Sequence, residues 1–134
     1  MKIFASVLLT LLLSGGFSAA QSPATPAGKW TCLGLVSSPP DTIDVRILSA
    51  MHKVFEGQPW HLQSDGTAQI TTREADNRLK VNAVRWAYDR ASQKLTLSST
   101  EEGQAGSQTF KVISLTHQRM ELTAGGVRYL FQAN

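Results

Sequence analysis

The stretch WHLQSDGTAQITT (residues 60–72) decides the fold class of this chain. Apolar Trp60 and Leu62 alternate with polar neighbours before an Asp65-Gly66 pair, and the alternation resumes at Ala68 after it. A period of two is typical of a half-buried strand. An Asp-Gly pair between two such runs favours a tight hairpin. We therefore predict two antiparallel strands joined at Asp65-Gly66.

The same alternation continues to the end of the chain. It predicts strands in the segments 28–36, 79–88, 95–97, 110–115, 120–122 and 127–131. Gly125-Gly126 predicts a second tight hairpin. Between Ala83 and Val84 the apolar positions change phase by one residue, which predicts a β-bulge at that point.

One segment has a helical period instead. Residues 39–56 carry apolar side chains that share one helix face, namely Ile43, Ile47, Leu48, Met51, Val54 and Phe55. Ser38 and Asp41 are the N-cap candidates, and Gly57 is the candidate for the residue that ends the helix. The helix is thus predicted between the first and second strands.

About eight strands joined by short hairpins predict a mainly β fold, an antiparallel up-and-down meander that closes into a barrel. Closure removes the exposed strand edges. An open sheet wrapped on the 39–56 helix, as in cystatins, fits the same order of elements. That alternative predicts Ile47, Met51 and Phe55 buried in the concave face of the sheet.

The first 20 residues have the features of a secretory signal peptide: Lys2, the apolar run VLLTLLL (residues 7–13), and small residues before Ala20-Gln21. We expect cleavage near Ala20-Gln21, a flexible leader over 21–27 and one domain over 28–134. The predicted location is periplasmic or secreted. No segment is long and apolar enough to predict a stable membrane anchor.

The formal net charge is +3, and the basic residues are spread along the chain among acidic neighbours. This pattern argues against nucleic acid as a partner. The sequence contains no phosphate-binding loop, HExxH or CxxC motif, and its three histidines are far apart. We therefore predict no enzymatic activity, no catalytic residue, no cofactor and no metal site.

Cys32 is the single cysteine, so it cannot form an intramolecular disulfide. Three interpretations stay open. It is a buried free thiol that packs as a small hydrophobe, it forms an intermolecular disulfide in an oxidising compartment, or it is a catalytic thiolate, which needs a base or cation nearby.

Short motifs across residues 28–132 resemble the small bacterial lipocalin-like proteins of the calycin superfamily. They are Gly28-Lys29-Trp30, Trp60 with Asp65-Gly66, 86–89 (WAYD), 95–97 (LTL), 112–116 (VISLT), 120–122 (MEL) and 129–131 (YLF). The resemblance implies a closed barrel of about eight strands with Trp30 at its floor, where Gly28 permits close approach. It also implies an arginine stacked on Trp30, with Arg128 as first candidate and Arg119 as second.

Two functions are compatible with such a barrel. In the first, an exported protein holds a small apolar or amphipathic ligand, with the helix near the mouth. The candidate ligand-binding residues are Trp60, Trp86, Tyr88, Phe110 and Tyr129. In the second, the barrel is filled, and a periplasmic interaction module of the inhibitor or immunity type binds a protein partner through loop 101–108 or the helix.

Overall fold

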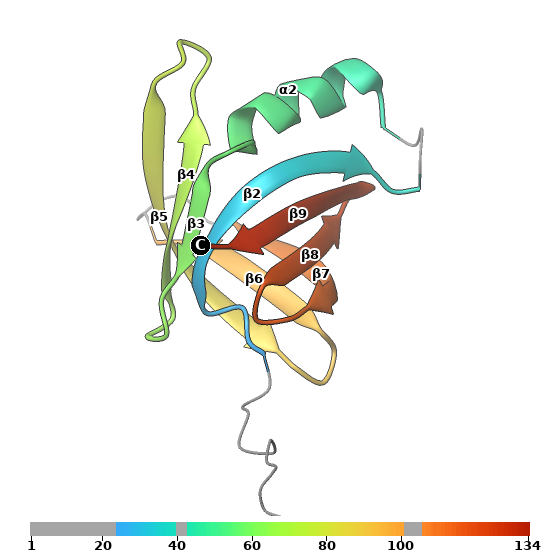
Figure 1. Cartoon of the computed structure of the whole chain (residues 1–134). Helices are drawn as coiled ribbons and strands as arrows, with labels where there is room; N and C mark the ends of the chain where they lie inside the picture. The colour runs from blue at the N-terminus through green and yellow to red at the C-terminus, as the bar shows by residue number, and fades with distance from the viewer. Residues whose placement is uncertain (1–23, 40–42, 101–105) are drawn as a thin grey trace, which may run out of the picture.

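The computed structural model describes residues 24–39, 43–100 and 106–134. Its elements, in chain order, are β2 (Gly28–Ser37), α2 (Val45–Phe55), β3 (Pro59–Leu62), β4 (Thr67–Arg73), β5 (Leu79–Asp89), β6 (Lys94–Ser99), β7 (Ser107–Leu115), β8 (Arg119–Ala124) and β9 (Val127–Ala133). Each strand pairs with the next, and β9 pairs back onto β2, so the described strands form one closed antiparallel barrel (Figure 1). The predicted mainly β meander is confirmed, and the open cystatin-like sheet is wrong because the sheet closes.

The β3–β4 hairpin forms as the sequence predicts. Oδ1 of Asp65 accepts hydrogen bonds from the backbone nitrogen of Thr67 at 3.0 Å and from its hydroxyl at 2.6 Å. Both bonds lower the pKa of Asp65, and the bond from the Thr67 hydroxyl has the larger effect. Gly66 has φ +93°, a backbone conformation that glycine adopts without strain. The hydrogen bonds of Asp65 and the conformational freedom of Gly66 therefore determine the shape of this turn.

The bulge predicted between Ala83 and Val84 is wrong. Strand β5 pairs with β4 in unbroken register through both residues, and its pairing with β6 begins at Val84 and is also unbroken. Leu79 and Val81 are apolar side chains on the exposed outer face, so the apparent change of phase is a change of face. The register shifts lie elsewhere, between Cys32 and Gly34 in β2 and in β7 between residues 112 and 114.

Helix α2 is shorter than the predicted 39–56. Asp44 is its N-cap and accepts a hydrogen bond from the backbone nitrogen of Arg46 at 2.8 Å. The candidate cap Asp41 lies outside the described residues, whereas Gly57 follows the helix with φ +76°, as the sequence predicts. No residue of α2 is fully buried, so the helix lies on the barrel and is not part of its core.

The interior of the barrel is filled with apolar side chains. The buried residues are Trp30, Cys32, Leu35, Trp60, Leu62, Ala68, Ile70, Leu95, Phe110, Val112, Met120, Leu122, Val127, Tyr129 and Phe131. Ile43, Leu48, Met51 and Phe55 pack against this core from the helix side, whereas Ile47, which we expected on the same face, is 57 % exposed. Eight strands enclose a space about wide enough for side chains, and here those side chains occupy it.

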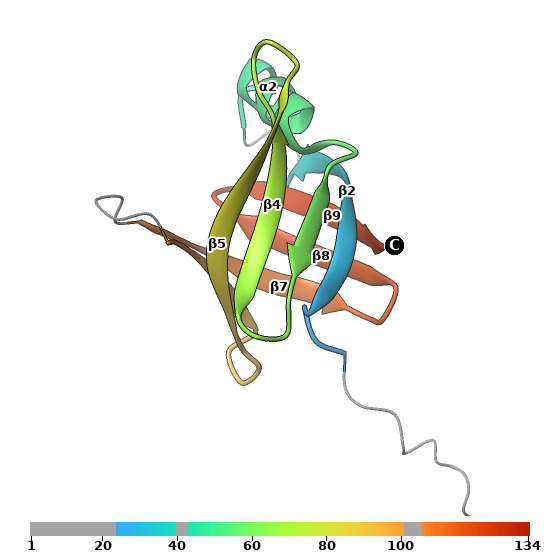
Figure 2. The same cartoon turned by 90° about the vertical axis from the view of Figure 1, so that its left-hand side faces the viewer.

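The two ends of the barrel are closed differently. Helix α2 lies at one end, which we call the helix end, and residues 24–27 approach the other, which we call the leader end (Figures 1 and 2). Pro26 is fully buried there, and its carbonyl oxygen accepts a hydrogen bond from Nε1 of Trp30 at 2.8 Å. We expected a flexible leader over 21–27. The position of Pro26 differs from that expectation, because this residue packs into the barrel.

This packing predicts that the short segment before β2 stabilises the whole barrel. A chain that begins at Gly28 should unfold with a free energy about 1–3 kcal/mol lower than a chain that begins at Ala24. The reason is that the buried indole of Trp30 loses its acceptor. Urea unfolding measures the difference. Equal stability of the two chains would show that Pro26 does not hold this end closed.

Candidate functional site

Five aromatic rings meet inside the barrel, and we call them the aromatic cluster: Phe55, Trp60, Phe110, Tyr129 and Phe131. Trp60 is central, with ring centroids 4.6 Å from Phe131 and 6.0 Å from Phe110. Phe110 and Tyr129 pack edge to face at 5.3 Å. The structure thus brings together three of the predicted ligand-binding residues, Trp60, Phe110 and Tyr129. Burial raises the pKa of the Tyr129 phenol, with a smaller contribution from nearby Cys32.

Trp60 carries a polar atom that has no hydrogen-bond partner among the described residues. Its side chain is 1 % exposed, and its Nε1 is buried with no hydrogen-bond partner. The other two indoles differ, because Trp30 donates to Pro26 and Trp86 donates to the carbonyl oxygen of Gln63 at 2.7 Å. A buried donor without an acceptor costs about 1–3 kcal/mol, and aromatic faces are weaker acceptors than oxygen.

Phe55 belongs to the aromatic cluster but comes from the helix. Its ring centroid lies 6.0 Å from that of Trp60 and 5.9 Å from that of Tyr129. Unlike those two residues, Phe55 is only partly buried. The last residue of α2 therefore inserts a phenyl ring between solvent and the barrel interior. The helical period predicted that Phe55 faces the core, but no sequence signal marked it as part of the site.

His52 attaches the helix to β2. Its Nδ1 accepts a hydrogen bond from the backbone nitrogen of Leu35 at 3.2 Å, and its Nε2 lies 3.3 Å from a carboxylate oxygen of Glu56. The ring lies directly on Gly34, where a Cβ would come within 2.7 Å of Cε1 of His52. Glycine at position 34 thus makes the room that this contact needs.

Trp86 and Tyr88 lie apart from the other predicted ligand-binding residues. They are half-buried at the leader end, where they line a hollow of about 430 Å³ with Pro26, Asp65 and the exposed Arg90. The ring contacts of the described residues do not join them to the aromatic cluster. The five predicted ligand-binding residues therefore lie in two separate places. Three are in the aromatic cluster, and two are near the leader end, toward which β5 runs.

Arg128 does not stack on Trp30. In the β2–β9 pairing Trp30 lies opposite Ala133, whereas Arg128 lies opposite Val36, five residues along β9. One guanidinium nitrogen of Arg128 is 3.7 Å from Glu121 on the β8–β9 wall. Arg119, the second candidate, is exposed on the outer face. The expected arginine is therefore wrong, and Pro26 satisfies the indole of Trp30 in its place.

Cys32 is a free thiol and is completely buried, the first of the three interpretations. Its sulfur lies 3.9 Å from the carbonyl oxygen of Gly34. Burial raises the pKa of Cys32 to about 11. A thiol with such a pKa carries almost no thiolate at neutral pH, which removes the nucleophile that catalysis needs.

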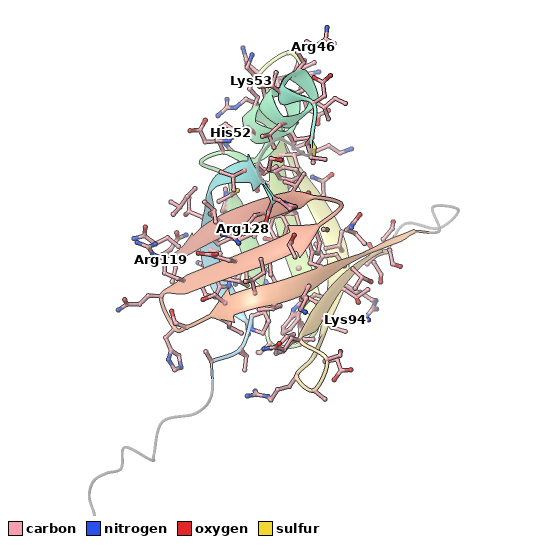
Figure 3. The ribbon with its side chains drawn as sticks, turned by 90° about the vertical axis from the view of Figure 1, so that its right-hand side faces the viewer. Arg46, His52, Lys53, Lys94, Arg119 and Arg128 are labelled. Atoms are coloured by element: carbon pink, nitrogen blue, oxygen red, sulfur yellow. The ribbon has the colours of Figure 1, made fainter. Side chains whose placement is uncertain are left out.

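The outer surface offers other hollows. One of them, about 560 Å³, lies between α2 and the β4–β5 turn and is lined by Ala50, Lys53, Val54, Glu56, Arg73, Glu74, Ala75 and Asn77. Arg46 and Lys53 lie on the helix, whereas Arg119 and Arg128 lie on the β8–β9 wall, so these cations do not gather on one face (Figure 3).

The described residues contain neither a cluster of metal ligands nor a membrane-spanning helix. No group of three or more His, Cys, Asp or Glu side chains lies close enough to hold a metal ion in the part of the chain that the structure describes. Within the same part, no helix has the length and apolar character to cross a membrane.

The fold has relatives among solved structures. A lipocalin-like protein from Bacteroides uniformis superposes with a TM-score of 0.58 and 16 % identity, over 81 % of this chain and 97 % of that one. An uncharacterized protein from Bacteroides eggerthii superposes with a TM-score of 0.57 and 14 % identity, over 81 % and 98 %. No family model and no curated protein matches the sequence. The resemblance to lipocalin-like proteins is thus confirmed for the fold.

The contact between His52 and Gly34 predicts a coupled effect on stability. Gly34→Ala should lower the free energy of unfolding by about 1–3 kcal/mol, because the new methyl group collides with the imidazole ring. In a His52→Ala background the same change should cost less, because the collision is gone and only the backbone strain of a side chain at φ +156° remains. Urea unfolding of the four proteins measures the coupling.

Gly106→Ala is the matched control for Gly34→Ala, since a Cβ at position 106 meets no atom within 4 Å. Additive effects of Gly34→Ala and His52→Ala would show that the imidazole does not rest on Gly34.

The burial of Cys32 predicts a thiol that does not react in the folded protein. Labelling by a thiol-specific disulfide reagent at pH 8 should be at least about a hundredfold slower than in urea, because the protein protects the thiol and keeps it protonated. The absorbance of the released thiolate measures the rate. Rapid labelling without urea, or a disulfide-linked dimer, would contradict the buried position.

Proposed function

We propose that the protein binds a small apolar or amphipathic molecule at the helix end of the barrel, between α2 and the aromatic cluster. The observation that carries this proposal is the position of Phe55. It belongs to a helix without a fully buried residue, and yet its ring reaches the aromatic core. Movement of α2 alone would open a space bordered by Trp60 and Tyr129.

The way α2 is attached supports this role. Among the described residues, α2 itself is held to β2 by its partly buried apolar side chains and by the imidazole of His52. The chain just after it is held by backbone hydrogen bonds from Gly57 to Cys32 and from Cys32 to Gln58. The barrel strands, in contrast, are joined by continuous backbone ladders. Elements with few buried contacts open at lower free energy than the core does. The helix is therefore easier to displace than a strand of the barrel, and its Phe55 contacts two rings of the aromatic cluster.

The proposal includes a location. Residues 1–20 act as a signal peptide that is removed near Ala20-Gln21, and residues 28–134 form the domain that works in the periplasm or outside the cell. The protein acts there by binding, without a reaction of its own. Mass spectrometry of the mature protein from its host determines where the chain begins.

A second candidate function is an interaction module with a filled barrel, such as an inhibitor or immunity-type protein. Exposed apolar side chains favour it, since Val45 and Ile47 on α2 are 74 % and 57 % exposed, and Leu79 and Val81 on β5 are 57 % and 61 % exposed. Large apolar side chains that gather on a surface often mark contacts with other proteins. The helix would then be the contact surface, as loop 101–108 would, although residues 101–105 of that loop lie outside the described residues.

The proposed site predicts that removal of the Phe55 ring creates an open pocket. Phe55→Ala should bind the uncharged probe N-phenyl-1-naphthylamine about tenfold more tightly than the unchanged protein, because the probe no longer has to displace a phenyl ring. Probe fluorescence measures the affinity.

Val45→Ala is the matched control, because it shortens an exposed apolar side chain of the same helix. It should bind the probe as the unchanged protein does. If Phe55→Ala and Val45→Ala bind equally weakly, the interior does not accept a ligand, and the interaction module becomes the better function.

A further inference from the structure

From the unpaired indole of Trp60 we infer that the barrel selects an uncharged ligand with an apolar body and one hydrogen-bond-accepting oxygen, as in a ketone or an ester. This inference rests on the proposed function and adds the chemical class of the ligand. Nε1 of Trp60 is the one described indole nitrogen that is buried without a partner, in a side chain 1 % exposed. A ligand oxygen would accept the hydrogen bond that Nε1 of Trp60 does not make to any described residue.

The position of the Trp60 ring supports a ligand. Trp60 lies at the centre of the aromatic cluster, and Phe55 from the helix is one of its ring neighbours. A molecule that displaced Phe55 would therefore lie against the same indole. It would also contact Tyr129, the second ring that Phe55 touches. The apolar body of the ligand replaces the phenyl ring, and its oxygen satisfies the donor.

The charge of the surroundings excludes an anionic group at this position. Among the described residues the buried side chains include no Asp, Glu, Lys or Arg, and the buried polar ones are Gln58 and Thr71. A carboxylate brought against Trp60 would be a buried charge without a cationic partner, which is strongly unfavourable. A neutral carbonyl oxygen needs only the one hydrogen bond that Nε1 offers.

The test uses the chain from residue 21 to residue 134 with Phe55→Ala, so that Pro26 is kept, and two probes of nearly the same shape. Acetophenone carries a carbonyl oxygen where α-methylstyrene carries a methylene group. Acetophenone should bind about threefold to tenfold more tightly than α-methylstyrene, which is the range that one hydrogen bond supplies. In Phe55→Ala with Trp60→Phe this preference should disappear. Benzoate should bind at least about tenfold more weakly than acetophenone because of its charge.

A second measurement identifies the nitrogen directly and does not depend on the double variant. The three tryptophans give three indole N–H signals in a proton–nitrogen NMR spectrum. On titration of Phe55→Ala with acetophenone, the signal of Trp60 should move downfield as its proton enters a hydrogen bond. The signal of Trp86, whose indole already donates to Gln63, is the internal control and should stay in place.

The outcomes separate this inference from the proposed function. Equal affinity for acetophenone and α-methylstyrene, or a preference that persists without the Trp60 indole, overturns the selection of an acceptor and leaves a purely apolar pocket. Binding of neither probe to Phe55→Ala overturns the proposed function and this inference with it.

Discussion

The closure of β9 onto β2 is the constraint on which the rest of the structure depends. Once the sheet is closed, the number of strands fixes the space inside, and inward side chains must fill that space or enclose a cavity. Here Trp60 and the rings around it occupy the centre. Binding inside such a barrel therefore needs a side chain that can leave. Phe55 is suited to this because it belongs to the helix and not to a strand.

The attachment of that helix depends on a local feature of β2. The register shift between Cys32 and Gly34 interrupts the regular alternation of the strand, and Gly34 there presents no side chain. The imidazole of His52 uses this room to reach the backbone nitrogen of Leu35. A strand irregularity thus decides where α2 rests, and the position of α2 decides that Phe55 meets Trp60. The site is in this sense a consequence of how β2 bends.

The two buried tryptophans of β2 and β3 differ in how their indole nitrogens are paired. At the leader end, Pro26 is buried and satisfies Trp30, so that end is closed by paired polar groups. Trp60 lies directly opposite Trp30 on β3, but its indole has no such partner among the described residues, and its neighbour Phe55 belongs to a helix without a fully buried residue. The indole of Trp30 therefore has its hydrogen bond within the protein, whereas the proposed ligand would supply one to Trp60.

The amino-acid sequence by itself determined the strands, the Asp65-Gly66 turn and the helix before the second strand, because these follow from local periodicity and turn chemistry. It also indicated that Trp60, Phe110 and Tyr129 belong to the interior. Only the tertiary structure decided that Trp86 and Tyr88 lie elsewhere, that Arg128 is far from Trp30, and that Phe55 completes the cluster. Contacts between strands depend on register and on barrel closure, which join residues that are far apart in the chain. Alternation along one strand carries no information about that register, so the site could be predicted only in part.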